Sequence, residues 1–207
     1  MNKIEINKKD LEALKALDPV LSEYIDNSEM PIRYYDNSFF ECVTKTLIGQ
    51  LISTKAADSI YQNLKHLLKQ VSAKNFIEKD KEEIINCGIY EKKYNQILTV
   101  AKDVKSGILD AQQLALSNDQ KVVKTLCKYP GIGPWSAEMI LLFGLKRKDI
   151  LSFNDFGIRS GVKKVYDLKT LSKVDFEKIK KRLSPYGSLA SLYFWQAHTK
   201  EWFKWKK

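Results

Sequence analysis

Apolar residues recur at helical spacing along most of the chain, whereas no segment shows the sustained alternation of apolar and polar residues that is typical of a strand. The series that follows Ser53 places its apolar side chains on one helical face, at Ala57, Ile60, Leu64, Leu67 and Leu68. A similar series runs from Tyr94 to Val104 and stops at Gly107. Connections between such series are short, and the chain has no repeats. The pattern therefore predicts an all-α fold.

Capping residues indicate where these helices begin. Asp18 is followed by a proline, which puts an acid at the N-cap position and the proline just inside the helix. The same reasoning places further helix starts at Ser38, Ser53, Asp80, Asn118 and Asp175. We expect the helix that starts at Ser38 to reach about Gly49, and the short helix that starts at Asp80 to end at Gly88. The helix that starts at Asp175 is expected to cover Phe176 to Leu183. The final helix is predicted from about Ser188 to Phe203.

The stretch from Leu126 to Gly161 carries the most distinctive pattern. Its first half predicts two apolar helices joined by a glycine-rich turn. Gly131 and Gly133 flank Ile132, as a tight turn requires when backbone amides must face outward. Pro134 fits the first position of the second helix, where its missing N–H is not needed. The free amides at that helix start would suit an anion such as a phosphate.

Charge changes this picture, because the chain of 207 residues carries a formal net charge of +10 that is unevenly spread. Residues 1–30 hold 4 basic and 7 acidic side chains, whereas residues 160–207 hold 12 basic and 4 acidic ones. A polarised basic charge fits a polyanion such as nucleic acid. Charge alone fits a lysine-rich solvated surface equally well.

Cysteine usage and hydropathy exclude several classes of protein. Cys42, Cys87 and Cys127 are too few and too widely spaced for a disulfide framework or a four-cysteine iron–sulfur cluster. The sequence shows no apolar run near 18 residues and no signal peptide. We expect an intracellular protein, located in the cytoplasm or nucleoid if the source is bacterial, with no membrane partner and no cofactor.

The turn from Tyr129 to Glu138, followed by an acid in the segment from Asn154 to Gly157, resembles the helix-hairpin-helix DNA glycosylases, and most of all their 3-methyladenine DNA glycosylase II branch. Further matches are the segment Leu47–Ala57, Gly88-Ile89-Tyr90 with Lys93, and Pro185–Ser188 with Tyr193-Phe194-Trp195. The resemblance covers roughly Asp18 to Trp202. It implies a single domain over residues 1–207 with two helical lobes around a cleft, a hairpin at about 120–144 and an acid turn at 152–161. Residues 1–35 are too short for the N-terminal β domain of larger relatives.

Asp155 is the candidate catalytic residue. From the residues alone it is an N-cap for the helix that carries Ile158 and Val162, and the resemblance places the catalytic aspartate of the family at the same position. The two roles are compatible. A fixed anion would stabilise the positive charge that builds on the sugar when an N-glycosidic bond breaks, and would orient the attacking water. A base alkylated at a ring nitrogen is already cationic and leaves with little acid assistance. We expect His66 and His198 to be surface or packing residues.

The resemblance assigns Trp135, Met139 and Trp195 to the base pocket. Related enzymes that also cut the strand carry a Schiff-base lysine at the position of Trp135, so the tryptophan implies a monofunctional enzyme that leaves an abasic site. From sequence alone both tryptophans could equally be core aromatics. Two departures bear on the preference for the base: Met139 replaces a tyrosine of some relatives, and Gly187 replaces a frequent arginine.

Gln50 and Leu51 lie at a helix break that the family uses to insert a side chain into the gap left by the flipped base. The resemblance assigns this wedge to Leu51, whereas the residues alone also allow a buried leucine in a helix turn. It further assigns phosphate binding to Gly131, Ile132 and Gly133.

No metal ligands are certain, although a monovalent cation at the hairpin carbonyls is implied by the family. The expected partner is double-stranded DNA that contains alkylated bases, bound by a monomer. Two alternatives stay open: a glycosylase for uracil or hypoxanthine on the same fold, and a non-catalytic DNA-binding hairpin protein. Asp155 favours a catalyst, because a pure binder has no need of an acid beside a phosphate backbone.

Overall fold

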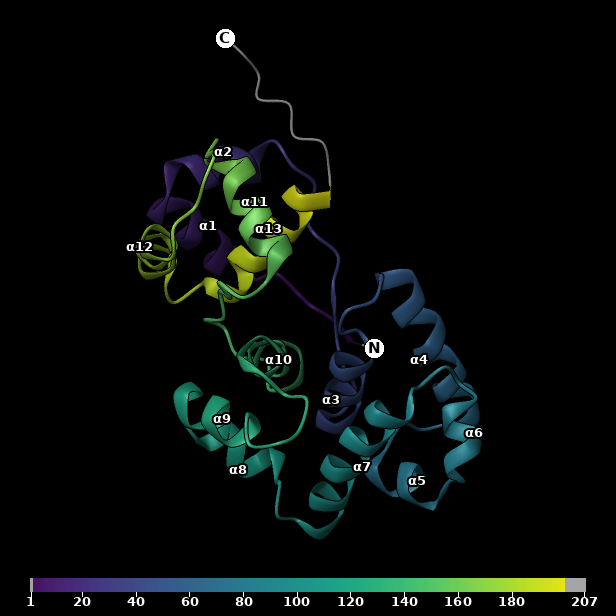
Figure 1. The fold of residues 1–207 in the computed structure, drawn as a ribbon. Coiled ribbons are helices and arrows are strands. Elements are labelled where there is room, and N and C mark those ends of the chain that lie inside the picture. Colours follow the sequence, from purple (N-terminus) through teal and green to yellow (C-terminus); the bar gives the residue numbers. More distant parts are fainter. Residues whose placement is uncertain (1, 200–207) are drawn as a thin grey trace. The chain divides into compact units, whose positions relative to one another are not determined.

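The computed structural model describes residues 2–199, and the chain divides into two compact units. We call residues 35–146 the hairpin unit, and residues 3–34 together with 147–199 the terminal unit (Figure 1). Regular structure in residues 2–199 is almost entirely helical, which confirms the predicted all-α class and the two helical lobes. The exceptions are two-residue strands, β1 (Asn2–Lys3) and β2 (Tyr34–Tyr35), so the N-terminal segment forms no β domain.

The hairpin unit is built around α3, a helix that is buried along most of its length and packs against α7 and the segment η1. An aromatic series supports it, because the Phe76 ring lies 6.0 Å from Phe40 on α3 and 5.5 Å from Tyr94 on α7. The elements of this unit are α3 (Phe39–Ile48), α4 (Thr54–Leu68), α5 (Ala73–Glu78), α6 (Lys81–Ile85), α7 (Glu91–Ser106), α8 (Ala111–Leu116), α9 (Asp119–Leu126), α10 (Pro134–Met139) and the π-helical η1 (Ile140–Gly144).

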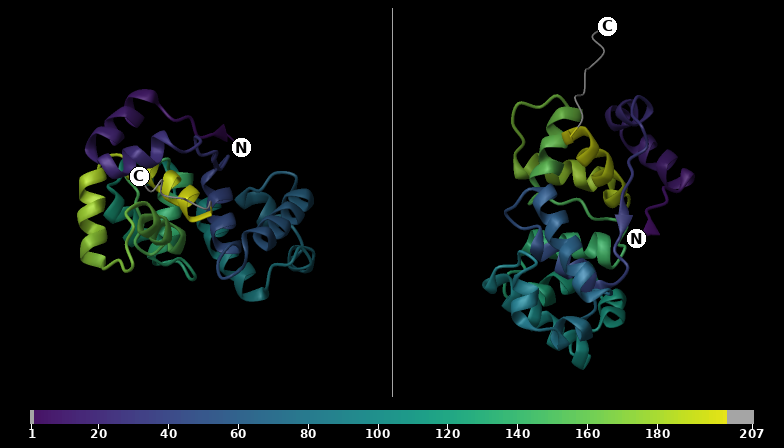
Figure 2. Two further views of the ribbon diagram at one scale, coloured as in Figure 1. Left: turned by 90° about the horizontal axis from the view of Figure 1, so that it is seen from above. Right: turned by 90° about the vertical axis from the view of Figure 1, so that its right-hand side faces the viewer.

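The terminal unit packs the helices of two distant segments around one core. Its elements are α1 (Lys8–Leu17), α2 (Pro19–Asp26), α11 (Phe156–Val165), α12 (Lys173–Leu183) and α13 (Gly187–Thr199). Leu14 and Leu21 from the first segment are fully buried with Phe176 and Phe194 from the second. Helices α11 and α13 lie side by side, green and yellow in Figure 1 and Figure 2. They approach so closely at Gly161 that a Cβ there would lie 1.9 Å from the Phe194 carbonyl oxygen.

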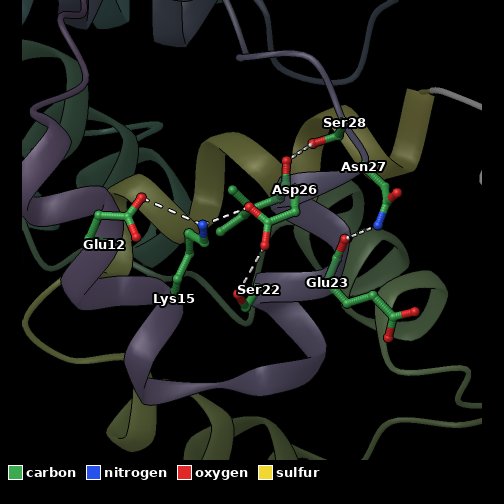
Figure 3. A network of polar contacts seen from close by, with 8 residues as sticks. Glu12, Lys15, Ser22, Glu23, Asp26, Asn27 and Ser28 are labelled. Atoms are coloured by element: carbon green, nitrogen blue, oxygen red, sulfur yellow. Dashed lines mark hydrogen bonds and ion pairs between the residues drawn. The ribbon is translucent and has the colours of Figure 1, made fainter.

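Polar contacts hold α1 against α2 within this unit. The Lys15 ammonium lies 2.6 Å from Asp26 and 3.5 Å from Glu12 (Figure 3). The hydrogen bond to Asp26 raises the pKa of Lys15. The Ser22 hydroxyl lies 3.5 Å from the other oxygen of Asp26, so this acid joins the two helices. Such exposed pairs add little stability by themselves and mainly fix the angle at which the two helices meet.

The predicted helix starts at Asp18, Ser38, Ser53, Asp80 and Asn118 are confirmed, because each side chain accepts a hydrogen bond from a first-turn amide. The predicted cap at Asp175 is wrong. Ser172 is the N-cap of α12, and its hydroxyl both accepts from the Asp175 amide and donates to the Asp175 carboxylate. The last helix begins at Gly187, and its predicted end at Phe203 lies outside the described residues.

None of the helices in residues 2–199 combines the length and the apolar character that a bilayer-spanning segment needs.

Candidate functional site

Asp155 is the N-cap of α11, as the sequence predicted, and its side chain is held by two donors. Its Oδ1 accepts hydrogen bonds from the Ile158 amide at 2.8 Å and from Trp195 Nε1 at 2.9 Å. The residue is only 8% exposed. A backbone amide of α11 and an indole of α13 thus fix the orientation of the carboxylate. The structure therefore brings together two of the predicted site residues, Asp155 and Trp195, inside the terminal unit.

The surroundings of this carboxylate are closely packed. A Cβ at Gly157 would lie 3.0 Å from Trp195 Cδ1 and 3.2 Å from Asp155 Oδ1. His198 packs here as expected, with Nδ1 2.9 Å from the Ser160 hydroxyl. The Phe156 ring meets His198 edge-on at 5.5 Å and is 69% exposed. An exposed aromatic directly beside the acid is a candidate contact to a nucleic acid.

Sequence reasoning did not single out Phe156, although a signal was present. The buried face of α11 is formed by Ile158, Gly161, Val162 and Val165. Phe156 lies off this helical face. Its position could have been found from the sequence, because it is an apolar residue that lies outside the buried face of the helix and directly follows the candidate catalytic acid.

The predicted hairpin is present in the hairpin unit. Helix α9 ends at Leu126, and α10 begins with Pro134 at its first position after the N-cap Gly133. Gly131 adopts the left-handed φ of +84° that such a turn needs, and Ile132 between the glycines is buried. The Tyr129 hydroxyl donates to Asp103 at 2.8 Å, which fastens the turn to α7.

Trp135 and Met139 lie one turn apart in this second helix. Trp135 is half-buried, and Met139 is 5% exposed. Residues four apart lie on one helical face, so both side chains start from the same side of α10. Their role in a base pocket stays a prediction.

Leu51 lies in the break between α3 and α4. It adopts a left-handed φ of +62°, and its side chain is fully exposed. The alternative of a buried leucine is therefore wrong. A groove of about 430 Å³ lies beside it, lined mainly by apolar side chains that include Ile48, Ile52, Ile60, Ile89 and Tyr90.

Gln50 does not share the exposure of its neighbour. Its amide Nε2 donates to the Gly131 carbonyl and to the Ser136 hydroxyl, both at 2.8 Å. Its Oε1 lies 3.4 Å from the Lys93 ammonium, which also donates to the Leu47 carbonyl at the end of α3. Burial lowers the pKa of Lys93. The predicted wedge and the predicted phosphate-binding turn are thus joined by one side chain.

Residues 44–185 match the family described as HhH-GPD superfamily base excision DNA repair protein. The match covers more than half of the chain. The chain belongs to the HhH-GPD superfamily. This confirms the predicted resemblance, and it places the Gln50 break, the hairpin and the Asp155 turn inside the region that matches the superfamily.

Individual relatives point to one branch of the superfamily. DNA-3-methyladenine glycosylase 1 of Schizosaccharomyces pombe is 26% identical over 203 residues, which are 95% of this chain and 87% of that protein. DNA-3-methyladenine glycosylase of Saccharomyces cerevisiae is 30% identical over 169 residues, 74% of this chain. The chain spans only 56% of that yeast protein, and 60% of a Bacillus subtilis relative.

Solved structures agree with the fold. A DNA-3-methyladenine glycosidase from Bacillus halodurans superposes with a TM-score of 0.78 at 26% identity, over 96% of this chain and 93% of that one. The Schizosaccharomyces pombe 3-methyladenine DNA glycosylase in complex with abasic DNA gives a TM-score of 0.81 at 22% identity, over 91% and 96%. This HhH-GPD protein therefore shares its fold with enzymes that act on DNA.

Proposed function

We propose that this HhH-GPD protein is a monofunctional DNA glycosylase, of the DNA-3-methyladenine glycosylase II type, that hydrolyses the N-glycosidic bond of alkylated purines in duplex DNA. The observation that carries the proposal is the fixed carboxylate of Asp155 at the start of α11. The matched superfamily and the named activities of its relatives support the same reaction. In this role the chain acts as a monomer and supplies the first step of base excision repair.

The chemistry needs one fixed anion. Positive charge develops on the deoxyribose as the base departs, and a preorganised carboxylate stabilises that charge without reorganising. Asp155 meets this need because two donors restrain its Oδ1 and little of the residue is exposed. The same carboxylate orients the attacking water. Groups of this kind contribute on the order of 10²-fold or more to a rate.

An alkylated purine is selected by its positive charge. Stacking on an aromatic side chain contributes about 1–3 kcal/mol per base, and a desolvated cation–π contact adds roughly 0.5–2 kcal/mol. Flipping a nucleotide costs a few kcal/mol and least for a damaged pair. Trp135 and Trp195, with Met139, are the proposed pocket residues. A cationic base would gain enough from two tryptophans to offset the flipping, whereas a neutral base would gain less.

Leu51 is the proposed wedge, and Gly131, Ile132 and Gly133 are the proposed phosphate contacts. A non-glycine residue at positive φ carries strain of about 1–3 kcal/mol and persists only where its surroundings impose it. A fully exposed apolar side chain in such a conformation suits insertion into a base stack. The exposed glycines of the turn leave room for a phosphate to approach the backbone. We further propose that the carbonyls of the turn bind a monovalent cation.

The test is release of free base, detected by mass, from duplexes that carry methylated purines, uracil or hypoxanthine. We expect release from the methylated duplex only. Asp155→Asn should reduce single-turnover release by on the order of 10²-fold or more. Binding should persist or tighten, because a charge that repels phosphate is removed. Release from uracil or hypoxanthine duplexes alone would favour the first alternative, and tight binding without release of any base would favour a DNA-binding protein. Near wild-type release by the asparagine variant would remove Asp155 from the mechanism.

A further inference from the structure

Gln50 links two stretches of chain that lie 81 residues apart. Its Nε2 reaches the Gly131 carbonyl inside the hairpin turn and the buried Ser136 hydroxyl in the first turn of α10. Both hydrogens of the amide are used, and both contacts measure 2.8 Å. A side chain committed to two inward contacts does not extend into a base stack. Of the two residues at the helix break, Leu51 is therefore the one that projects outward, and its side chain is fully exposed.

Lys93 holds the opposite side of the same loop. Its ammonium donates to the Leu47 carbonyl, one of the terminal carbonyls of α3, and lies 3.4 Å from Gln50 Oε1. Lys93 of α7 therefore holds the end of α3 from which the loop of residues 49–53 starts. Gln50, the second residue of this loop, is hydrogen-bonded to the hairpin turn. Leu51 follows directly after these anchors and takes its left-handed conformation there. Local sequence would not impose that conformation on a leucine.

We propose that Gln50 and Lys93 are positioning residues that lock the Leu51 loop to the hairpin turn, so that wedge and phosphate clamp act as one rigid body. The inference rests on the proposed function, because it takes Leu51 as the wedge and the turn as the clamp. A preassembled pair loses less conformational freedom when DNA binds. Gln50 thus acts through Leu51 and not by its own contact with DNA.

The experiment is a double-mutant cycle between Gln50→Met and Leu51→Ala. Methionine keeps the length of glutamine but cannot donate to Gly131 or Ser136. The probe is a duplex with a tetrahydrofuran abasic analogue and 2-aminopurine in the opposite strand, so that fluorescence reports unstacking at the wedge. Lys93→Met is measured in parallel. The matched control is Lys92→Met, which removes an exposed lysine of the same helical turn.

We expect Gln50→Met and Lys93→Met to weaken binding by roughly 10-fold, the scale of one or two lost hydrogen bonds, and to reduce the fluorescence change as Leu51→Ala does. The double variant should bind no more than about twofold more weakly than Leu51→Ala alone, because residues that act as a unit are not additive. Lys92→Met should show no loss of fluorescence change. If Gln50→Met does not fold, as judged by its thermal unfolding midpoint, Ser136→Ala removes one acceptor and should act in the same direction with a smaller effect.

If the losses of binding free energy in Gln50→Met and Leu51→Ala add up in the double variant, the positioning role is overturned, because Gln50 would then act independently of Leu51. An unchanged fluorescence response in Gln50→Met, with a clear loss in Leu51→Ala, would also overturn it. The readout requires no base release. If the cycle shows the expected coupling but the wild-type protein releases no methylated base, the proposed function is refuted while the positioning role of Gln50 and Lys93 is supported.

Discussion

The indole nitrogen of Trp195 donates a hydrogen bond of 2.9 Å to Oδ1 of Asp155, across the contact between α13 and α11. The same oxygen accepts the Ile158 amide, so that one donor is set by local backbone and the other by tertiary packing. The bond also locks the indole ring beside the acid. The orientation of the proposed catalytic carboxylate therefore depends on the packing of two helices.

Trp195→Phe should lower single-turnover base release by on the order of 10-fold while the protein stays folded. Phenylalanine retains an aromatic ring but removes the donor that restrains Asp155, and loss of such restraint weakens a preorganised charge. Quenched-flow measurement with saturating enzyme separates this effect from binding. Trp135→Phe, which alters a second proposed pocket tryptophan, is measured in parallel to show how much of any loss comes from the pocket and how much from the donor to Asp155. A Trp195→Phe rate within twofold of wild type would show that the indole N–H has no role.

No strand cleavage should accompany base release. An amine nucleophile is required for the covalent imine that leads to scission, and the resemblance to the helix-hairpin-helix glycosylases implies that Trp135 stands where strand-cleaving relatives carry lysine. Incubation with methylated duplex should leave the backbone intact until alkali is added, and borohydride should trap no protein–DNA adduct. Lysines close to the hairpin turn in the sequence include Lys128, Lys146 and Lys148. An adduct that disappears on mutation of one of them would overturn the monofunctional assignment.

Gly161→Ala should destabilise the terminal unit by about 3 kcal/mol or more. Its Cβ would lie 1.9 Å from a backbone oxygen of α13, which cannot move aside by a change of rotamer. Urea unfolding followed by circular dichroism would measure the shift in midpoint. Gly133→Ala offers the comparison, because a Cβ there meets nothing within 4 Å and its φ of −95° suits any residue. Equal stability of the two variants would show that α11 and α13 can separate without penalty.

Glu41 should make the hairpin unit sensitive to acid. Burial alone would raise its pKa, but hydrogen bonds from Tyr61 and Asn37 and the charge of Lys45 outweigh burial and lower the pKa. A carboxyl with a depressed folded pKa contributes stability above its ordinary value of 4.5, and this stability is lost as pH falls through the folded value. The difference in unfolding free energy between wild type and Glu41→Gln should therefore shrink from neutral pH to below about pH 4. A difference that stays constant over this range would exclude this role for Glu41.

Features set by neighbouring residues were predictable from the sequence. Helix starts at Asp18, Ser38 and Asn118 depend on a side chain and the amides of the next turn, so local chemistry determines them. The error at Asp175 has the same origin. Ser172 and Asp175 lie three residues apart and can both cap, and only the register of the buried residues on α12 decides between them. The short helices α5 and α8 contain too few turns for a periodic pattern.

Features set by distant contacts were not predictable. The exposure of Leu51 follows from anchors on Lys93 and Gly131, and nothing near Leu51 in the sequence announces a left-handed leucine. The inward direction of Gln50 and the hydrogen bond between Trp195 and Asp155 are likewise set by contacts between residues far apart in the sequence. The resemblance to known glycosylases suggested which residues matter, and the structure adds how the chain holds them.

The composition of the terminal unit has a consequence for synthesis of the chain. Helices α1 and α2 leave the ribosome early, but their buried partners lie on α11, α12 and α13. Residues 35–146 are contiguous and can fold as soon as they emerge, since domains generally fold as units during synthesis. Leu14 and Leu21 remain without their core until residues 147–199 arrive. A nascent chain would thus complete its hairpin turn before Asp155, the proposed catalytic residue, is locked in place.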